Sequence, residues 1–149
     1  TIPDNVTEIG SSAFSQCYEL QSVSIGNGIT KISNSLFSSC NKLTDVSLTD
    51  NITEIGENAF RSFGDNSHGF SQRLMEYLIL PQSLKKLGKG AFEDAGIRAI
   101  YIAGPQAISE RCFQGGGLRK VILGDNVKTI ESVAFGSCSS CISIVREQF

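Results

Sequence analysis

The chain has 149 residues, of which 40% are hydrophobic, and this is enough apolar surface for one packed core or one run of stacked repeats. The formal net charge of −2 gives no electrostatic reason to expect binding to nucleic acid or to an anionic membrane surface. No apolar run approaches the roughly 18 residues of a membrane-spanning helix, so we expect no membrane insertion.

The first segment of the chain carries an apolar pair, Val6 and Ile9, then Phe14, and then an alternating triplet at 23–25. Alternation of apolar and polar residues predicts a strand with one buried face. The stretch 26–28 follows, and its glycines and asparagine are the residue types that turns require. This segment therefore predicts a strand bounded by turns, with further apolar residues on either side.

The same pattern recurs along the chain with a period of about 23 residues. Its clearest mark is a small or apolar residue followed by phenylalanine, which defines six units: Ala13-Phe14, Leu36-Phe37, Ala59-Phe60, Ala91-Phe92, Cys112-Phe113 and Ala134-Phe135. One insertion, near 61–74, lengthens a single repeat by about nine residues. One unit cannot enclose its own apolar residues but stacked units can, so we predict a single repeat domain over 1–149.

Stacking predicts a solenoid with a parallel β-sheet on one face, short irregular, 3-10 or β segments on the other, and little α-helix. The phenylalanine column should fill the interior. A β-helix is the closest rival, because it also stacks parallel coils. The spacing L-x-x-V-x-I, as in Leu20, Val23 and Ile25, and the period near 23 favour a leucine-rich-repeat solenoid.

The segment 2–17, IPDNVTEIGSSAFSQC, and the Leu20, Val23 and Ile25 that follow it resemble the BspA-like class of leucine-rich repeat. The consensus of that class reads roughly I-P-x-x-V-x-x-I-G-x-x-A-F-x-x-C-x-x-L-x-x-V-x-I. The resemblance extends over the chain apart from the insertion and is looser after Phe92. It implies a surface or secreted protein, mostly of bacteria, that adheres by binding host or matrix proteins. The sequence contains no signal peptide.

Three cysteines, Cys17, Cys40 and Cys138, occupy the same position of the repeat. Stacked thiols suggest a disulfide or a metal site, but small buried thiols that fill a corner of each coil are the simpler interpretation. Cys138 and Cys141 form a lone C-x-x-C, whereas a structural zinc site needs four ligands. We therefore predict no metal site and no cofactor.

The insertion contains His68, the only histidine of the chain. No nucleophile and carboxylate accompany it in a pattern that would make it catalytic, so we predict no catalytic residues. Insertions into repeats project from one face and often bind ligands, which makes Phe63, His68 and Phe70 loop candidates for binding. The alternative is a tolerated surface loop whose two phenylalanines pack onto the neighbouring coil.

Strand residues that point away from the core should form columns on the sheet. One column reads Ser24, Ser47, Ile79, Tyr101, Ile122 and Val145, and the next reads Ser22, Asp45, Tyr77, Ala99, Lys120 and Ser143. An exposed apolar patch often marks an interaction site, and tyrosine is enriched at binding hot spots. We predict a contact surface, edged by Arg98 and Arg119, made by Tyr77, Ile79, Tyr101, Ile122 and Lys120. The alternative is that β-branched and aromatic residues simply suit a sheet surface.

Together these patterns predict a non-enzymatic module that binds a protein ligand, such as a host or matrix protein, at a cell surface or after secretion. A structural spacer and a carbohydrate-binding module are the alternatives. Open ends of a solenoid expose its apolar interior unless they are capped, so end-to-end self-association is a further expectation.

Overall fold

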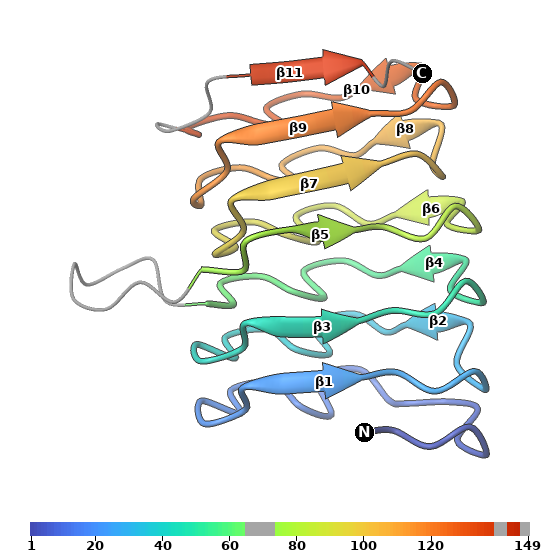
Figure 1. The fold of residues 1–149 in the computed structure, drawn as a ribbon. Coiled ribbons are helices and arrows are strands. Elements are labelled where there is room, and N and C mark those ends of the chain that lie inside the picture. Colours follow the sequence, from blue (N-terminus) through green and yellow to red (C-terminus); the bar gives the residue numbers. More distant parts are fainter. Residues whose placement is uncertain (65–73, 139–142, 147–149) are drawn as a thin grey trace.

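The computed structural model describes residues 1–64, 74–138 and 143–146. In these ranges the chain winds into a parallel β-solenoid, each repeat adding one turn, and the described residues form no helix (Figure 1). The predicted fold class is therefore confirmed. The turns have a strand on the front face, a strand of two residues on the back face, and a strand-free wall that carries the phenylalanine.

The front face is formed by the longer strands, which lie one above another in Figure 1: β1 (Ser22–Ser24), β3 (Asp45–Ser47), β5 (Leu78–Ile79), β7 (Ala99–Ile102), β9 (Lys120–Leu123) and β11 (Ser143–Arg146). The back face is formed by β2 (Lys31–Ile32), β4 (Glu54–Ile55), β6 (Lys86–Leu87), β8 (Ala107–Ile108) and β10 (Thr129–Ile130). All paired strands are parallel, and equivalent repeat positions face each other, as in Val23 opposite Val46 and Ile100 opposite Val121. This register stacks each repeat position into a column.

The front face is not one continuous sheet. Strands β1 and β3 form a two-stranded sheet, and β5, β7, β9 and β11 form a separate four-stranded sheet. On the back face, β2, β4 and β6 pair without interruption across the same level. The front face is therefore broken between β3 and β5, where the chain carries its insertion, while the back face holds the two halves together.

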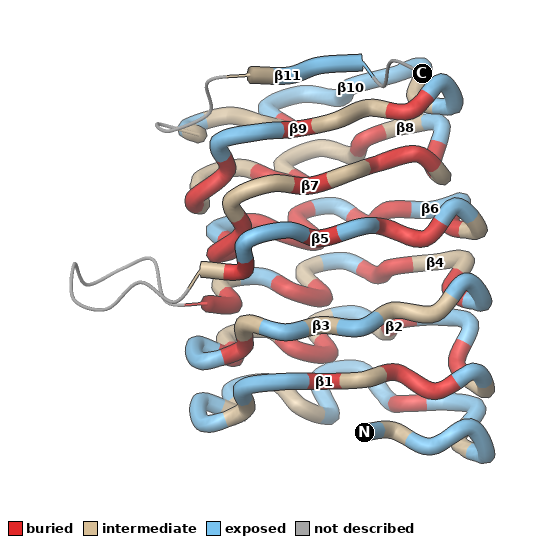
Figure 2. The backbone as a smooth tube through the Cα atoms, viewed as in Figure 1, coloured by how far each residue is buried: buried red, intermediate tan, exposed pale blue. Residues whose placement is uncertain are grey.

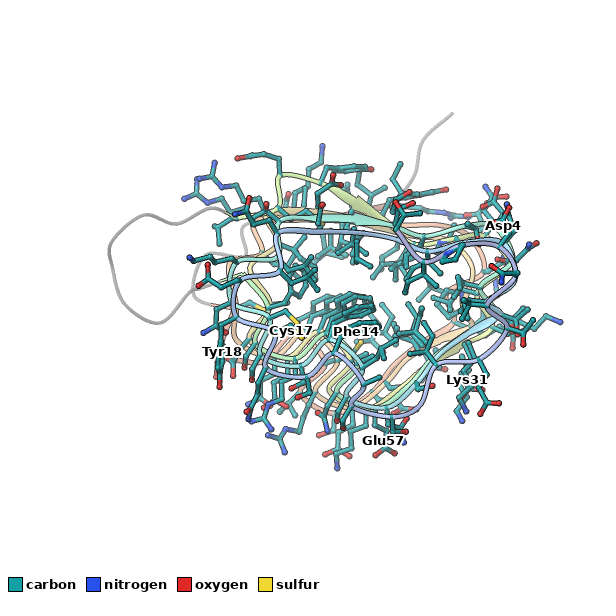
Figure 3. All side chains as sticks on the ribbon, turned by 90° about the horizontal axis from the view of Figure 1, so that it is seen from below. Asp4, Phe14, Cys17, Tyr18, Lys31 and Glu57 are labelled. Atoms are coloured by element: carbon teal, nitrogen blue, oxygen red, sulfur yellow. The ribbon has the colours of Figure 1, made fainter. Side chains whose placement is uncertain are left out.

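The interior is filled by the phenylalanine column, whose rings stack face to face (Figure 3). Ring centroids are 5.6 Å apart for Phe14 and Phe37, 5.4 Å for Phe37 and Phe60, and 5.1 Å for Phe60 and Phe92. The column continues through Phe113 to Phe135 at similar spacing. Figure 2 shows buried segments in every turn, with exposed segments mainly at the corners and the two ends. The core is thus one apolar column along the solenoid axis.

The wall that carries the phenylalanines turns sharply at two places in each repeat. Ser35 and Ser39 flank Phe37 with φ angles of 54° and 60°, and equivalent residues in other turns also have positive φ. Backbone bonds between turns support this wall: the Phe14 N–H donates to the Leu36 carbonyl at 3.1 Å, and the Phe37 N–H to the Ala59 carbonyl at 2.8 Å. The paired left-handed residues direct every ring inward.

Candidate functional site

The front face presents the residues that the sequence predicted as a contact surface. Ile79 lies opposite Tyr101, Tyr101 opposite Ile122, and Ile122 opposite Val145 on consecutive parallel strands. Ile79 is 58% exposed and Val145 39%, while Tyr101 and Ile122 are half-buried. The structure therefore brings these side chains into one row along the solenoid axis, with neighbours about 4.8 Å apart, the spacing of paired strands.

A second row lies beside the first and is more polar. Ala99 faces Lys120, which in turn faces Ser143. Tyr77 precedes β5 at the level of Ala99 and is 46% exposed. The apolar side chains of the two rows form a surface that we call the apolar patch, made of Tyr77, Ile79, Tyr101, Ile122 and Val145, with Lys120 at its edge. Sequence reasoning placed Val145 in the correct column but left it out of the predicted contact surface.

Positive charge borders the apolar patch at its C-terminal end. Lys120 and Arg119 are exposed, and within the described residues neither has an ion-pair partner. Arg98 instead pairs with Glu76, with 3.2 Å between Nη1 and Oε1. At the other end of the front face, Ser47 and Asp45 are exposed and small or acidic. The face is thus polar and acidic near β3, apolar in the middle, and basic near β9.

Several charged side chains on the back face form ion pairs with one another. Glu54 lies between Lys31 and Lys86, with N–O distances of 3.2 and 3.1 Å, and Lys89 pairs with Glu110 at 3.0 Å. These residues line a shallow hollow of about 320 Å³. Burial by itself would raise the pKa of Glu54, but hydrogen bonds and charge from Lys86 and Lys31 outweigh it and hold the pKa below its ordinary 4.5. The back face therefore forms a structural ladder of ion pairs.

The cysteines differ in burial. Cys40 and Cys112 are buried, while Cys17 and Cys138, in the same column as Cys40, are only partly buried. The Cys40 thiol donates to the Phe14 carbonyl at 3.1 Å, and burial raises its pKa from 9.0 to about 11. Among the described residues, no group of three or more His, Cys, Asp or Glu side chains is placed to hold a metal ion. Cys141 lies outside the described residues.

The insertion candidates divide into two groups. Phe63 is fully buried, with its ring edge-on to Phe60 at 5.9 Å and to Phe92 at 6.5 Å. Phe63 is therefore a core residue, and its expected place in a projecting binding loop is corrected: the ring fills the space beside the phenylalanine column. His68 and Phe70 lie outside the described residues.

No helix in the described part of the chain is long and apolar enough to cross a lipid bilayer. Among curated proteins, no relative matches the chain. Solved bacterial structures share its fold at low identity. A leucine rich cell surface protein from Faecalibacterium prausnitzii is 23% identical, with a TM-score of 0.62 over 97% of this chain and 46% of that one.

A leucine-rich repeat protein from Bacteroides ovatus is 21% identical, with a TM-score of 0.70 over 97% of this chain and 38% of that one. A leucine-rich repeat protein from T. pallidum is 22% identical, with a TM-score of 0.52 over 95% of this chain and 72% of that one. The chain thus spans less than half the length of the first two proteins. The family model described as BspA type leucine rich repeat region, in six copies, matches residues 1–68 and 65–148. The chain therefore belongs to the BspA-type leucine-rich repeat family.

Proposed function

We propose that this chain is a non-enzymatic binding module of a cell-surface or secreted protein, and that its apolar patch contacts a protein ligand. The observation that carries this proposal is the row formed on consecutive strands by exposed Ile79 and half-buried Tyr101 and Ile122. A row of this kind on an uncovered sheet suits protein contact, because aromatic and apolar side chains with a charged rim are typical of interface centres.

The rest of the surface supports the same choice. On the back face, the charges of Lys31, Glu54 and Lys86 and of Lys89 and Glu110 are already used in ion pairs. The lysine and arginine that border the apolar patch are unpaired among the described residues. They can steer an acidic region of a ligand toward the patch. The cell-surface description of the Faecalibacterium protein is compatible with this role.

The proposal is tested on an array printed with extracellular-matrix proteins and purified glycans. We expect the protein to bind one or more protein spots, and the double variant Tyr101→Ala/Ile122→Ala to lose at least tenfold in signal. The matched control is Ser24→Ala/Ser47→Ala, which changes the same column in the polar half of the front face. Thermal unfolding of both variants checks that the fold is retained.

Other outcomes of the array separate the alternatives. Binding to glycan spots alone would favour a carbohydrate-binding module, for which the rings of exposed Tyr77 and half-buried Tyr101 would be the stacking surfaces. Absence of binding to every spot would favour a structural spacer. Equal loss of signal in the control variant would place the contact elsewhere on the front face.

A further inference from the structure

The break in the front face leaves backbone groups without partners among the described residues. At intact junctions, the residue after the front strand donates to the next turn: the Ile25 N–H reaches the Ser47 carbonyl at 3.0 Å, and the Leu80 N–H reaches the Tyr101 carbonyl at 3.0 Å. No corresponding bond joins Leu48 to Ile79 among the described residues. In Figure 1 the space between β3 and β5 is visibly wider than between other neighbouring front strands.

The hydrogen bonds of β3 show which of its backbone N–H and C=O groups point into the break. The Asp45 N–H donates to the Gln21 carbonyl and the Ser47 carbonyl accepts from Ile25, so both residues direct their backbone groups toward β1. Backbone groups alternate along a strand, and those of Val46 therefore point into the break. By the same alternation, Ile79 points its groups into the break from the β5 side, since Leu80 bonds to β7.

The break also exposes apolar side chains. Val46 is half-buried, whereas Val23, Leu78 and Ile100 at the same repeat position are buried. Leu48 is likewise half-buried, although Ile25 and Leu80 in its column are buried. A surface hollow of about 620 Å³ occupies this level and is lined by Thr44, Asp45, Val46, Leu74, Met75, Glu76 and Tyr77.

Two buried polar side-chain atoms of the described residues also lack hydrogen-bond partners, although neither residue lines the hollow itself. The buried side-chain atoms that lack a hydrogen-bond partner among the described residues are Thr49 Oγ1 and Arg98 Nε. Thr49 follows β3, and Arg98 reaches toward Glu76 at the edge of the hollow. Asp45 is exposed and has no ion-pair partner among the described residues. The hollow thus offers open strand edges, apolar contacts and an unpaired carboxylate.

We propose that the break between β3 and β5 is a docking site for an extended, basic peptide segment of a partner protein. The backbone of that segment bonds to the open edge of β3, its apolar side chains contact Val46 and Tyr77, and a lysine or arginine pairs with Asp45. Strand addition to an open sheet edge is a common mode of peptide recognition. This inference rests on the proposed protein-binding function and adds the chemistry of the partner.

The probe is a fluorescent peptide of about eight residues in which valine and threonine alternate around one central lysine, a length matched to short edge strands. We expect saturable binding by fluorescence anisotropy, at least tenfold weaker for the matching glutamate peptide. Asp45→Lys should weaken binding of the lysine peptide at least tenfold, and Asp50→Lys, an exposed acidic control outside the hollow, should not. Two further peptides carry N-methyl groups on alternate amides, in one peptide on the odd-numbered and in the other on the even-numbered residues. Only the peptide whose methylated amides face β3 should lose binding.

Binding should also slow exchange of the Val46 and Leu48 amide protons, which locates the peptide at the break. Equal binding of the lysine and glutamate peptides, equal binding of both N-methylated registers, or absence of saturable binding would overturn the proposal. The Tyr101→Ala/Ile122→Ala variant should still bind the peptide. If that variant loses array binding while the peptide tests fail, the docking site falls and the proposed function stands. If the peptide binds but the variant keeps array binding, the apolar patch is the proposal that fails.

Discussion

At the scale of single residues, the phenylalanine column is the main source of cohesion between turns. Phe37 is fully buried and stacks between Phe14 and Phe60, with centroids 5.6 and 5.4 Å away. Offset aromatic pairs contribute about 0.5–1.5 kcal/mol beyond the burial of their area. Each ring thus stabilises its own turn and both neighbouring turns.

Replacing Phe37 by alanine should lower the free energy of unfolding by roughly 3–5 kcal/mol, because apolar contact is lost and a cavity is left. Urea denaturation monitored by circular dichroism measures this change. Tyr18→Ala is the control, since Tyr18 is 51% exposed and points away from the core (Figure 3). An unchanged denaturation midpoint for Phe37→Ala would contradict the role of the column.

The cysteines should differ in reactivity according to their burial. Burial keeps reagents from Cys40 and raises its pKa to about 11, so little thiolate is present near neutral pH. At about pH 8 we expect a maleimide to label Cys17 in the native protein, and Cys40 and Cys112 only after unfolding. Peptide mapping by mass spectrometry assigns the labels. Native labelling of Cys40 as fast as Cys17 would show that the turns open freely.

At the scale of elements, the strands are too short to be stable alone. The back strands have two residues each, and neighbours such as β4 pair on both sides. Strand pairing therefore contributes only as part of the stack. The column formed by Lys31, Glu54 and Lys86 adds alternating charge across three of these strands, and like charges stay apart because Glu54 separates them.

Glu54→Gln should reduce the free energy of unfolding at pH 7 by about 0.5–1 kcal/mol, the range of partly exposed ion pairs. The pKa of Glu54 is lowered in the folded state, so its contribution is present above pH 4.5 and is lost as pH falls through the folded pKa. The difference between wild type and variant should therefore shrink as the pH falls below 4.5 through the folded pKa of Glu54. Urea titrations at several pH values measure it. Glu57→Gln, whose side chain lacks an ion pair among the described residues, is the matched control and should change the free energy of unfolding at pH 7 by less than Glu54→Gln.

At the scale of the whole molecule, the two front sheets are held together by the back sheet of β2, β4 and β6 and by the core column, and β8 and β10 form a second back sheet. The rings of Phe60 and Phe92 stack at 5.1 Å across the level of the break, and β4 pairs with β6 there. The break is therefore confined to the front face. This arrangement leaves an open edge without dividing the domain.

Amide exchange should detect this open edge directly. We expect the Leu48 amide to exchange at least tenfold faster than those of Ile25 and Leu80, which occupy its column and donate to the next turn. Hydrogen–deuterium exchange followed by NMR makes the comparison. Protection of Leu48 equal to that of Leu80 would mean that the front face closes in solution.

The sequence by itself determined the repeat, the parallel stacking, the inward phenylalanines and the composition of the apolar patch. These features follow from local periodicity, which places the same residue type at the same point of every turn. The columns containing Ile79, Tyr101 and Ile122 could therefore be predicted without coordinates. For Phe63 the sequence left two places open, a projecting loop and the neighbouring coil, because its local sequence fits both; the structure places the ring against the coil.

Only the tertiary structure decided where the front face is continuous. Val46 has the same local pattern as Val23, yet one lies at an open edge and the other within a paired, buried column. Backbone pairing between β3 and β5 depends on how the chain re-enters the front face after 65–73, and Leu74 begins that re-entry beside the hollow. Periodicity predicts which residues share a column. Whether two neighbouring strands form backbone hydrogen bonds depends on how the chain places them relative to each other.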